Sequence, residues 1–210
     1  MRVLVLGLVC CFGFAHTALA QATPGCNATQ AAVARTALDD AKSLTIKAAA
    51  RVEEGAPYER WFGTYFPRNA EVVRANLKAI ATAIRTGAVV TECLAQFDDD
   101  CAASEFAWVY PSEPYRIYLC PAFFTLPHLS TLQPDTPRGD TGTREGTLVH
   151  EISHFNPVAR TDDHCYTRRE CAAMAQVDPA RAINNADSYQ YFVEDVTHAA
   201  RQPVAGKTAP

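Results

Sequence analysis

The sequence Gly-Thr-Leu-Val-His-Glu-Ile-Ser-His-Phe occupies residues 146–155 and carries the most informative pattern in the chain. Its apolar residues are typical of a buried helix rather than of a loop. On such a helix His150 and His154 lie one turn apart on the same face, because they are four residues apart in sequence. Two imidazoles placed in this way can bind one metal ion, while Glu151 stays free to accept a proton from a water molecule. The spacing is that of zinc-dependent peptidases.

The first 20 residues are typical of a signal peptide. Arg2 precedes an apolar run over residues 3–14, and Ala-Leu-Ala at residues 18–20 forms a small-x-small cleavage motif. We expect cleavage after this motif, which leaves residues 21–210 as a single zinc metallopeptidase domain. The apolar run is too short to span a membrane and no later segment qualifies, so we expect a secreted protein without a membrane partner.

Length and composition predict one globular domain with an extensive core, since 48% of the 210 residues are hydrophobic and 20% are charged. The formal net charge is −4 and no long basic run occurs, which argues against nucleic acid as a partner. We expect a monomer.

The cysteines indicate a disulfide framework. Of eight cysteines, Cys10 and Cys11 leave with the signal peptide and six remain. In an oxidising compartment an even number predicts three disulfide bonds, although the sequence does not fix how they pair. The six are Cys26, Cys93, Cys101, Cys120, Cys165 and Cys171.

Helices dominate the expected secondary structure. Apolar residues at helical spacing predict one long helix over residues 29–54. Asn69 can cap a second helix that runs to about residue 86. A short helix is expected over residues 168–176 and the last one over residues 182–200.

Strands are fewer. Residues 89–93 are a candidate strand, and the alternating segments 106–110 and 115–119 predict a hairpin, whose open end Cys101 and Cys120 flank. The long loop over residues 121–142 is expected to form a wall of a substrate cleft. The expected fold class is therefore α+β and mainly helical: a zincin-like metalloprotease domain with a small antiparallel sheet and an active-site helix.

A catalytic zinc site needs a third protein ligand and an open position for water. One class of these peptidases has a histidine six residues after the second histidine, but that residue is Arg160 here. Another class uses a glutamate from a following helix, for which Glu170 and Glu194 are candidates without a supporting motif. The remaining candidate is Asp163.

In this region the sequence resembles the deuterolysin and peptidyl-Lys metalloendopeptidase family, the aspzincins. In that family a Gly-Thr-x-x-type segment with an aspartate ligand follows the metal helix, and a Tyr-Gly pair comes next. The resemblance makes Asp163 the third ligand and Tyr166 the family tyrosine, while the neighbours Asp162 and His164 stay open as alternative ligands. Other similar segments are residues 61–65 (Trp-Phe-Gly-Thr-Tyr), 109–111 (Val-Tyr-Pro), 118–120 (Tyr-Leu-Cys) and 185–192 (Asn-Ala-Asp-Ser-Tyr-Gln-Tyr-Phe).

Two residues depart from the family pattern. Arg160 stands in place of the glycine before the threonine, and Thr167 in place of the glycine after the tyrosine. Cys165 and Cys171 bracket this region, so a disulfide between them could hold the loop that carries the third ligand.

The resemblance implies a metalloendopeptidase that acts on proteins or peptides with one Zn²⁺ per chain. His150, His154 and Asp163 would hold the ion, which activates a water molecule. Glu151 would act as general base, and Tyr166 would donate a hydrogen bond to the developing oxyanion.

Asp187 and Gln190 are the expected substrate-binding residues. In the Lys-specific branch of the family, an aspartate at the position of Asp187 faces the pocket for the residue after the cut, and a glutamate follows three residues later. Because Gln190 is neutral, we expect a preference for a basic residue that is weaker or broader. The alternative for Asp187 is a helix-face aspartate near a helix start, where the helix dipole favours negative charge.

A second hypothesis is a secreted binding protein or effector with weak or no catalysis that keeps the fold. The departures at Arg160 and Thr167 favour it. Glu151 argues against it, because a structural metal site has no need of a neighbouring base.

Overall fold

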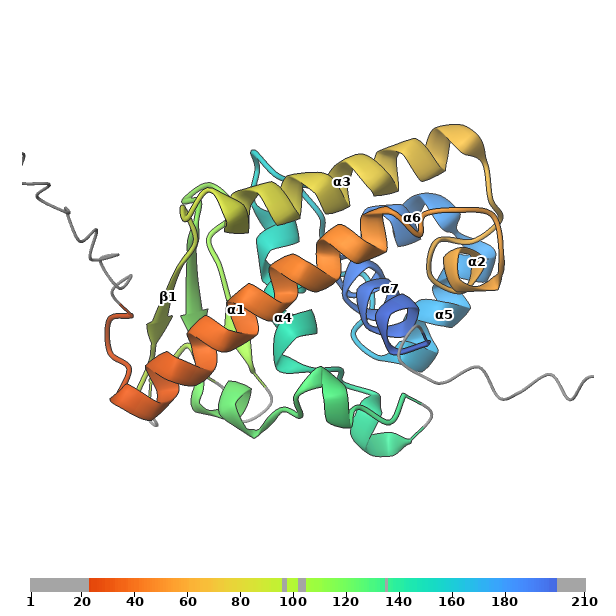
Figure 1. Ribbon diagram of the computed structural model, residues 1–210. Coiled ribbons are helices and arrows are strands. Elements are labelled where there is room, and N and C mark those ends of the chain that lie inside the picture. Colours follow the sequence, from red (N-terminus) through yellow and green to blue (C-terminus); the bar gives the residue numbers. More distant parts are fainter. Residues whose placement is uncertain (1–22, 96–97, 102–104, 135, 200–210) are drawn as a thin grey trace, which may run out of the picture.

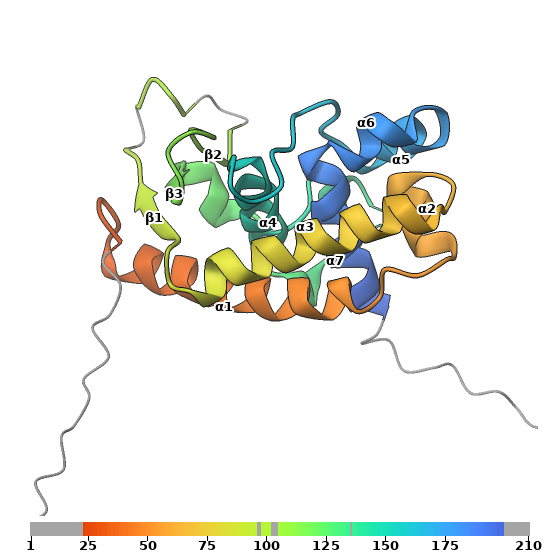
Figure 2. The same cartoon turned by 90° about the horizontal axis from the view of Figure 1, so that it is seen from above.

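The computed structural model describes residues 23–95, 98–101, 105–134 and 136–199 (Figures 1 and 2). The expected signal peptide lies outside these residues, so it stays a prediction, as does the single domain over residues 21–210. Within the described ranges, no helix is long and apolar enough to cross a membrane.

Two long helices run side by side and support the rest of the fold (Figures 1 and 2). Helix α1 (Ala28–Ala49) begins at Asn27, whose side chain and that of Gln30 form a reciprocal capping box. The buried face of α1 is mostly alanine, which allows a close approach of α3 (Pro67–Arg85).

The bounds of both helices differ from the prediction. Helix α1 ends before residue 54, and the carbonyl oxygen of Val52 instead accepts a hydrogen bond from Arg74 of α3. Asn69 is not the cap of α3, because the helix already begins at Pro67. Proline suits the first helical turn, where its missing N–H would have no partner.

The expected hairpin is present, but the sheet is mixed rather than antiparallel. Strands β2 (Ala107–Trp108) and β3 (Arg116–Leu119) pair antiparallel, and β1 (Val90–Cys93) pairs parallel with β3, in the order β1-β3-β2. Alternation identifies a strand but does not say which neighbour it pairs with, so the parallel contact was not predictable from the pattern.

The described cysteines form three disulfides, as expected. Cys26–Cys93 ties the start of the described chain to β1, and Cys101–Cys120 joins the segment before β2 to the end of β3. Cys165–Cys171 links the loop after α4 to α5.

Helices α4 (Arg144–His154) and α7 (Ala186–Ala199) pack together between the sheet and a group of shorter helices (Figure 2). These shorter helices are α2 (Ala56–Phe62), α5 (Arg168–Val177) and α6 (Pro179–Ile183). The aromatic residues of α2 are buried against α7, where Phe62 meets Tyr189 and Phe192.

The last predicted helix is divided into α6 and α7 at Asn184 and Asn185. The division has a tertiary cause: Oδ1 of Asn185 accepts the backbone N–H groups of His164 and Cys165 at 2.7 and 3.2 Å. A continuous helix would not leave this side chain free to hold the loop.

Residues 121–142 are not the cleft wall that the sequence predicts. They form three 3₁₀ helices, η1 (Pro121–Thr125), η2 (Leu129–Thr131) and η3 (Pro137–Gly139). Of their described residues, only Thr141 lines the main cavity.

Candidate metal centre and cleft

Helix α4 is fixed at its start by a cap that reaches α7. The Thr143 hydroxyl oxygen accepts the N–H of Gly146 at 3.0 Å, and the Thr143 hydroxyl and N–H both donate to Oε1 of Glu194. A Cβ atom at Gly146 would lie 2.1 Å from the same oxygen. Only glycine therefore allows this approach of α4 to α7.

A buried ion cluster holds the other side of Glu194. Arg168 pairs with the carboxylates of Glu194 and Asp195, and its Nε donates to the carbonyl oxygen of Gly139 at 3.0 Å. Burial raises the pKa of Glu194 to about 7, although Arg168 and Thr143 act in the opposite direction. These contacts occupy both oxygens of Glu194, which excludes it as a metal ligand.

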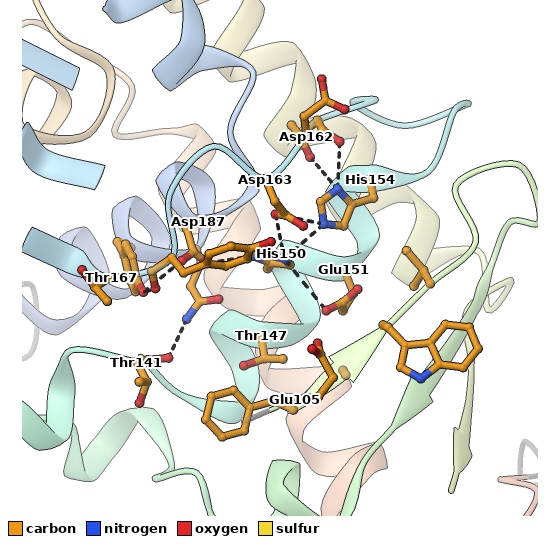
Figure 3. A pocket seen from close by; sticks show the side chains of 18 of the residues that line it. Glu105, Thr141, Thr147, His150, Glu151, His154, Asp162, Asp163, Thr167 and Asp187 are labelled. Carbon is orange, nitrogen blue, oxygen red and sulfur yellow. Dashed lines mark hydrogen bonds and ion pairs between the residues drawn. The ribbon is translucent and has the colours of Figure 1, made fainter. Parts of the chain in front are cut away.

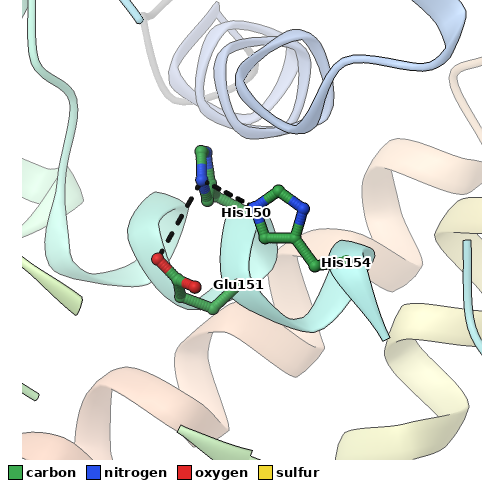
Figure 4. Close-up of side chains that lie close together, drawn as sticks. All are labelled: His150, Glu151 and His154. Carbon is green, nitrogen blue, oxygen red and sulfur yellow. Dashed lines mark hydrogen bonds and ion pairs between the residues drawn. The ribbon is translucent and has the colours of Figure 1, made fainter. Parts of the chain in front are cut away.

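The Nε2 atoms of the two motif histidines, His150 and His154, face each other (Figure 4). Nδ1 of His154 lies 2.8 Å from the carbonyl oxygen of Thr161, and Nδ1 of His150 lies 2.6 Å from Oδ1 of Asp187. A carbonyl oxygen only accepts, and a carboxylate accepts, so both Nδ1 atoms carry the proton. The two Nε2 atoms, 3.1 Å apart, therefore point lone pairs at one another unless a cation lies between them.

Asp163 completes a triangle with these two nitrogens. Its Oδ1 lies 3.3 Å from Nε2 of His150 and 3.4 Å from Nε2 of His154 (Figure 3). Tetrahedral zinc with ligands at about 2.0–2.1 Å has ligand atoms about 3.3 Å apart. The donor set and its spacing therefore fit Zn²⁺.

The alternative ligands point elsewhere. Oδ2 of Asp162 accepts a hydrogen bond from Asn184 at 2.8 Å, and the nearest recorded partner of the His164 ring is Arg181 at 3.5 Å. Glu170 is exposed at the start of α5. Among these candidates from the sequence, the distances favour Asp163.

Glu151 lies beside the triangle rather than in it. Its Oε1 is 3.9 Å from Nε2 of His150, and Figure 4 shows the side chain next to the histidine pair. The Oδ1 atom of Asp163 is closer to the same nitrogen, at 3.3 Å. Burial raises the pKa of Glu151 to about 8, although His150 lowers it. A carboxylate with a raised pKa next to a metal centre can accept and release a proton.

The protonation of the histidine pair follows from its neighbours. Burial disfavours the charged form of His150, but Asp187, Glu151 and Asp163 outweigh this effect and raise its pKa to about 10. Burial and His150 lower the pKa of His154. Without metal, a proton on His150 therefore lies between the two Nε2 atoms.

An open cavity of about 710 Å³ lies in front of the triangle (Figure 3). One wall is the β2 segment, residues 105–109 and 111; the others come from α4, from α7 and from residues 161–167. This size is in the range of ligand-binding clefts.

Tyr166, Asp187 and Gln190 all line this cavity. Tyr166 is 62% exposed, and desolvation followed by the charge of Asp163 raises its pKa. Asp187 is buried: one oxygen lies 2.6 Å from Nδ1 of His150, and the other lies 3.1 Å from the hydroxyl oxygen of Tyr191. Gln190 is also buried and donates to the carbonyl oxygen of Thr141 at 3.2 Å.

Three features of the site have no signal in the sequence. They are the Thr161 carbonyl that orients His154, the Asn185 side chain that anchors the loop after α4, and Glu105 on the cavity wall. A carbonyl oxygen is common to every residue, and Glu105 lies outside every motif, so spacing could not identify them.

The backbone at Arg160 has the conformation that a glycine would have at this position. Arg160 has a φ of 55°, a left-handed conformation that glycine adopts most readily. The position therefore has the geometry of the glycine that the resemblance places there. The Cys165–Cys171 disulfide holds the same loop from its other side.

A second group of potential ligands, Asp40, His128 and Glu145, does not fit a metal. The N–H of Ser130 donates to Nδ1 of His128 at 3.0 Å, so this nitrogen is unprotonated. The proton of the neutral ring is then on Nε2, which lies 3.2 Å from both Asp40 and Glu145. A protonated Nε2 offers no lone pair to a metal ion.

Comparisons with known proteins identify the family of this chain. The aspzincin family model, described as lysine-specific metallo-endopeptidase, matches residues 47–194. A peptidyl-Lys metalloendopeptidase of Pleurotus ostreatus is 30% identical over 178 residues, which cover 81% of this chain and 95% of that protein. An extracellular protease of Aeromonas hydrophila is 35% identical over 174 residues, 81% of this chain but only 46% of the relative. This chain thus spans about half the length of the Aeromonas protein.

A solved structure has the same fold. The zinc peptidase from Grifola frondosa superposes with a TM-score of 0.69 at 27% identity, over 82% of this chain and 98% of that one. The family model and the Pleurotus relative both match most of the described residues. From its sequence and its fold, the chain belongs to the aspzincin family of metallo-endopeptidases.

Proposed function

We propose that this protein is a secreted zinc-dependent endopeptidase that cleaves proteins or peptides, with one Zn²⁺ held by His150, His154 and Asp163. The observation that carries the proposal is the triangle of Nε2, Nε2 and Oδ1, with sides of 3.1, 3.3 and 3.4 Å, at the base of an open cavity. A structural zinc site is closed by four protein ligands, whereas this one offers three and a cleft.

A Zn²⁺ ion at this place supplies Lewis acidity, which acidifies water and polarises a carbonyl group. Glu151 takes the proton of the attacking water and passes it to the leaving amine. Its carboxylate lies beside the triangle and lines the cavity, which places it next to the open position of the site. The Tyr166 hydroxyl donates a hydrogen bond to the oxygen of the substrate carbonyl as negative charge develops there.

Asp187 has a positioning role in this proposal. Its carboxylate accepts the Nδ1 proton of His150, which fixes the tautomer that presents Nε2 to the metal. The Thr161 carbonyl does the same for His154. Asp187 also lines the cavity, but it is only 4% exposed and one of its oxygens is already held by His150.

Secretion, the signal peptide and a monomeric state belong to the same proposal. The apolar run after Arg2 and the three disulfides support export to an oxidising compartment. The relative from Aeromonas hydrophila is named an extracellular protease.

Cleavage of a denatured protein tests the proposal. The protein would be incubated as isolated, with a chelator, and with chelator followed by added zinc, in parallel with Glu151→Gln, and product termini read by mass spectrometry. We expect cuts that the chelator and the substitution abolish and that zinc restores. Folded, zinc-loaded protein that makes no cuts would refute the proposal and favour a binding protein.

A further inference from the structure

Glu105 is a carboxylate of the cavity wall that no motif explains. It lies two residues before β2, and its side chain points into the cavity beside Thr147 and toward Glu151 (Figure 3). It makes no hydrogen bond or ion pair with any residue that the structure describes.

The charge of Glu105 interacts with the residues of the candidate metal centre. Desolvation raises the pKa of Glu105, while the charge of His150 lowers it and that of Asp163 raises it. Glu105 in turn contributes to the raised pKa values of Glu151 and Tyr166. A partly desolvated carboxylate without a partner gains more from a nearby cation than one in open solvent.

The other carboxylates near the triangle have other partners. Asp163 faces the two histidines, Asp187 contacts His150 and Tyr191, and Glu151 lies against His150. Asp162 also lines the cavity and is exposed, but its Oδ2 accepts a hydrogen bond from Asn184 at 2.8 Å. Among the carboxylates of the described cavity wall, Glu105 is therefore the exposed one that has no hydrogen-bond or ion-pair partner among the described residues.

We propose that Glu105 is a specificity-determining residue that selects a basic side chain, Lys or Arg, in the substrate residue on one side of the scissile bond. This inference rests on the proposed endopeptidase function. The position follows from the shared cavity: Glu105 and Glu151 line the same space, so a side chain that reaches Glu105 belongs to a residue next to the reacting carbonyl.

The ammonium or guanidinium group would form an ion pair with the Glu105 carboxylate in a site open to solvent. Such pairs contribute modestly, so we expect a preference of about twofold to fivefold and not absolute specificity. This source of selectivity differs from the one that the sequence indicates, in which Asp187 and Gln190 form the pocket.

The test compares peptides that carry lysine or its neutral isostere norleucine at each of the two positions that flank the cut. The readout is the ratio of kcat/KM for the two peptides within each variant, because a general loss of activity cancels in this ratio. We expect a ratio of about two to five at one position for the wild type and a ratio near one for Glu105→Gln.

Two further variants sharpen the test. Glu105→Lys should invert the preference, so that a glutamate peptide is cleaved faster than its glutamine counterpart. Glu113→Gln removes the same charge from an exposed position of the same hairpin, outside the cavity, and should leave the lysine ratio unchanged. Circular dichroism and zinc content would verify that each variant is folded and loaded.

The outcomes separate the inference from the function on which it rests. Cleavage without a charge preference, or a lysine ratio that survives in Glu105→Gln, would overturn the role of Glu105 and leave the peptidase intact. Absence of cleavage of every peptide by zinc-loaded wild type would refute the endopeptidase function, and this inference with it.

Discussion

Replacing Asp187 by asparagine removes the negative charge that holds His150 but keeps the shape of the side chain. Oδ1 of Asp187 lies 2.6 Å from Nδ1 of His150, and the residue is only 4% exposed. The amide oxygen of asparagine can still accept the Nδ1 proton, so the ring keeps its orientation and loses only the charge-assisted part of the hydrogen bond.

The expected magnitude follows from that difference. A hydrogen bond to a charged group contributes about 1.5–3 kcal/mol and a neutral one about 1 kcal/mol, so the variant loses about 0.5–2 kcal/mol. Zinc binding should therefore be about twofold to thirtyfold weaker. Competition with a chromophoric chelator at fixed pH measures the dissociation constant directly.

Asp162→Asn is the matched control, since it neutralises a carboxylate near the site whose side chain bonds to Asn184 instead. We expect its zinc affinity to stay within about twofold of the wild type. Equal zinc affinity in Asp187→Asn and the wild type would refute the orienting role of Asp187. A loss in Asp162→Asn larger than in an Asp163→Asn variant would show that the ligand has been misassigned.

Three other predictions address protons, stability and catalysis. Zinc must displace the proton of His150, whose pKa in the metal-free protein is about 10, above the ordinary 6.5. This proton stabilises the metal-free protein. Its full contribution is present below about pH 6.5 and is lost as the pH rises toward 10. Zinc affinity should accordingly rise with pH across that window, with about one proton released at pH 7, which titration calorimetry in buffers of different ionisation enthalpy would detect. Arg168→Met should lower the free energy of unfolding by about 3–5 kcal/mol in urea denaturation, because it leaves Glu194 buried without its cation, whereas the exposed Arg169→Met should change it by less than about 0.5 kcal/mol. Tyr166→Phe should reduce kcat by about 10²–10³-fold with zinc content unchanged, and an unaltered kcat would rule out its role at the oxyanion.

The metal helix was the most predictable part of this chain, because its signal is local. A four-residue spacing of histidines in an apolar segment predicts the helix and the shared face, and the structure has α4 over Arg144–His154. The signal for the hairpin was equally local, because the alternating segments and the Pro-rich turn between them lie within about fifteen residues.

Contacts between distant segments were not predictable from periodicity. Asp187 meets His150 across 37 positions of sequence, and Asn185 divides the expected last helix in order to hold the backbone at His164. Helical spacing favours a helix on both sides of Asn185 and carries no information about a loop that binds it. The parallel pairing of β1 with β3 is non-local in the same way.

The third ligand lies between these cases. Spacing left Asp162, Asp163 and His164 open, and the family resemblance favoured Asp163. The hydrogen bond from Asn184 to Asp162 explains why neighbouring aspartates differ, since it turns one carboxylate away while the other faces the histidines. Arg160 departs from the family glycine in the sequence, and the structure adds that its backbone has the left-handed conformation that glycine favours.

Crystals of the zinc-loaded protein, with anomalous diffraction recorded above and below the zinc edge, would test the central claim most directly. We predict one strong peak per chain, about 2.0–2.1 Å from Nε2 of His150, Nε2 of His154 and Oδ1 of Asp163. A peak coordinated by Asp162 or His164 in place of Asp163, or zinc bound at Asp40, His128 and Glu145 alone, would contradict it.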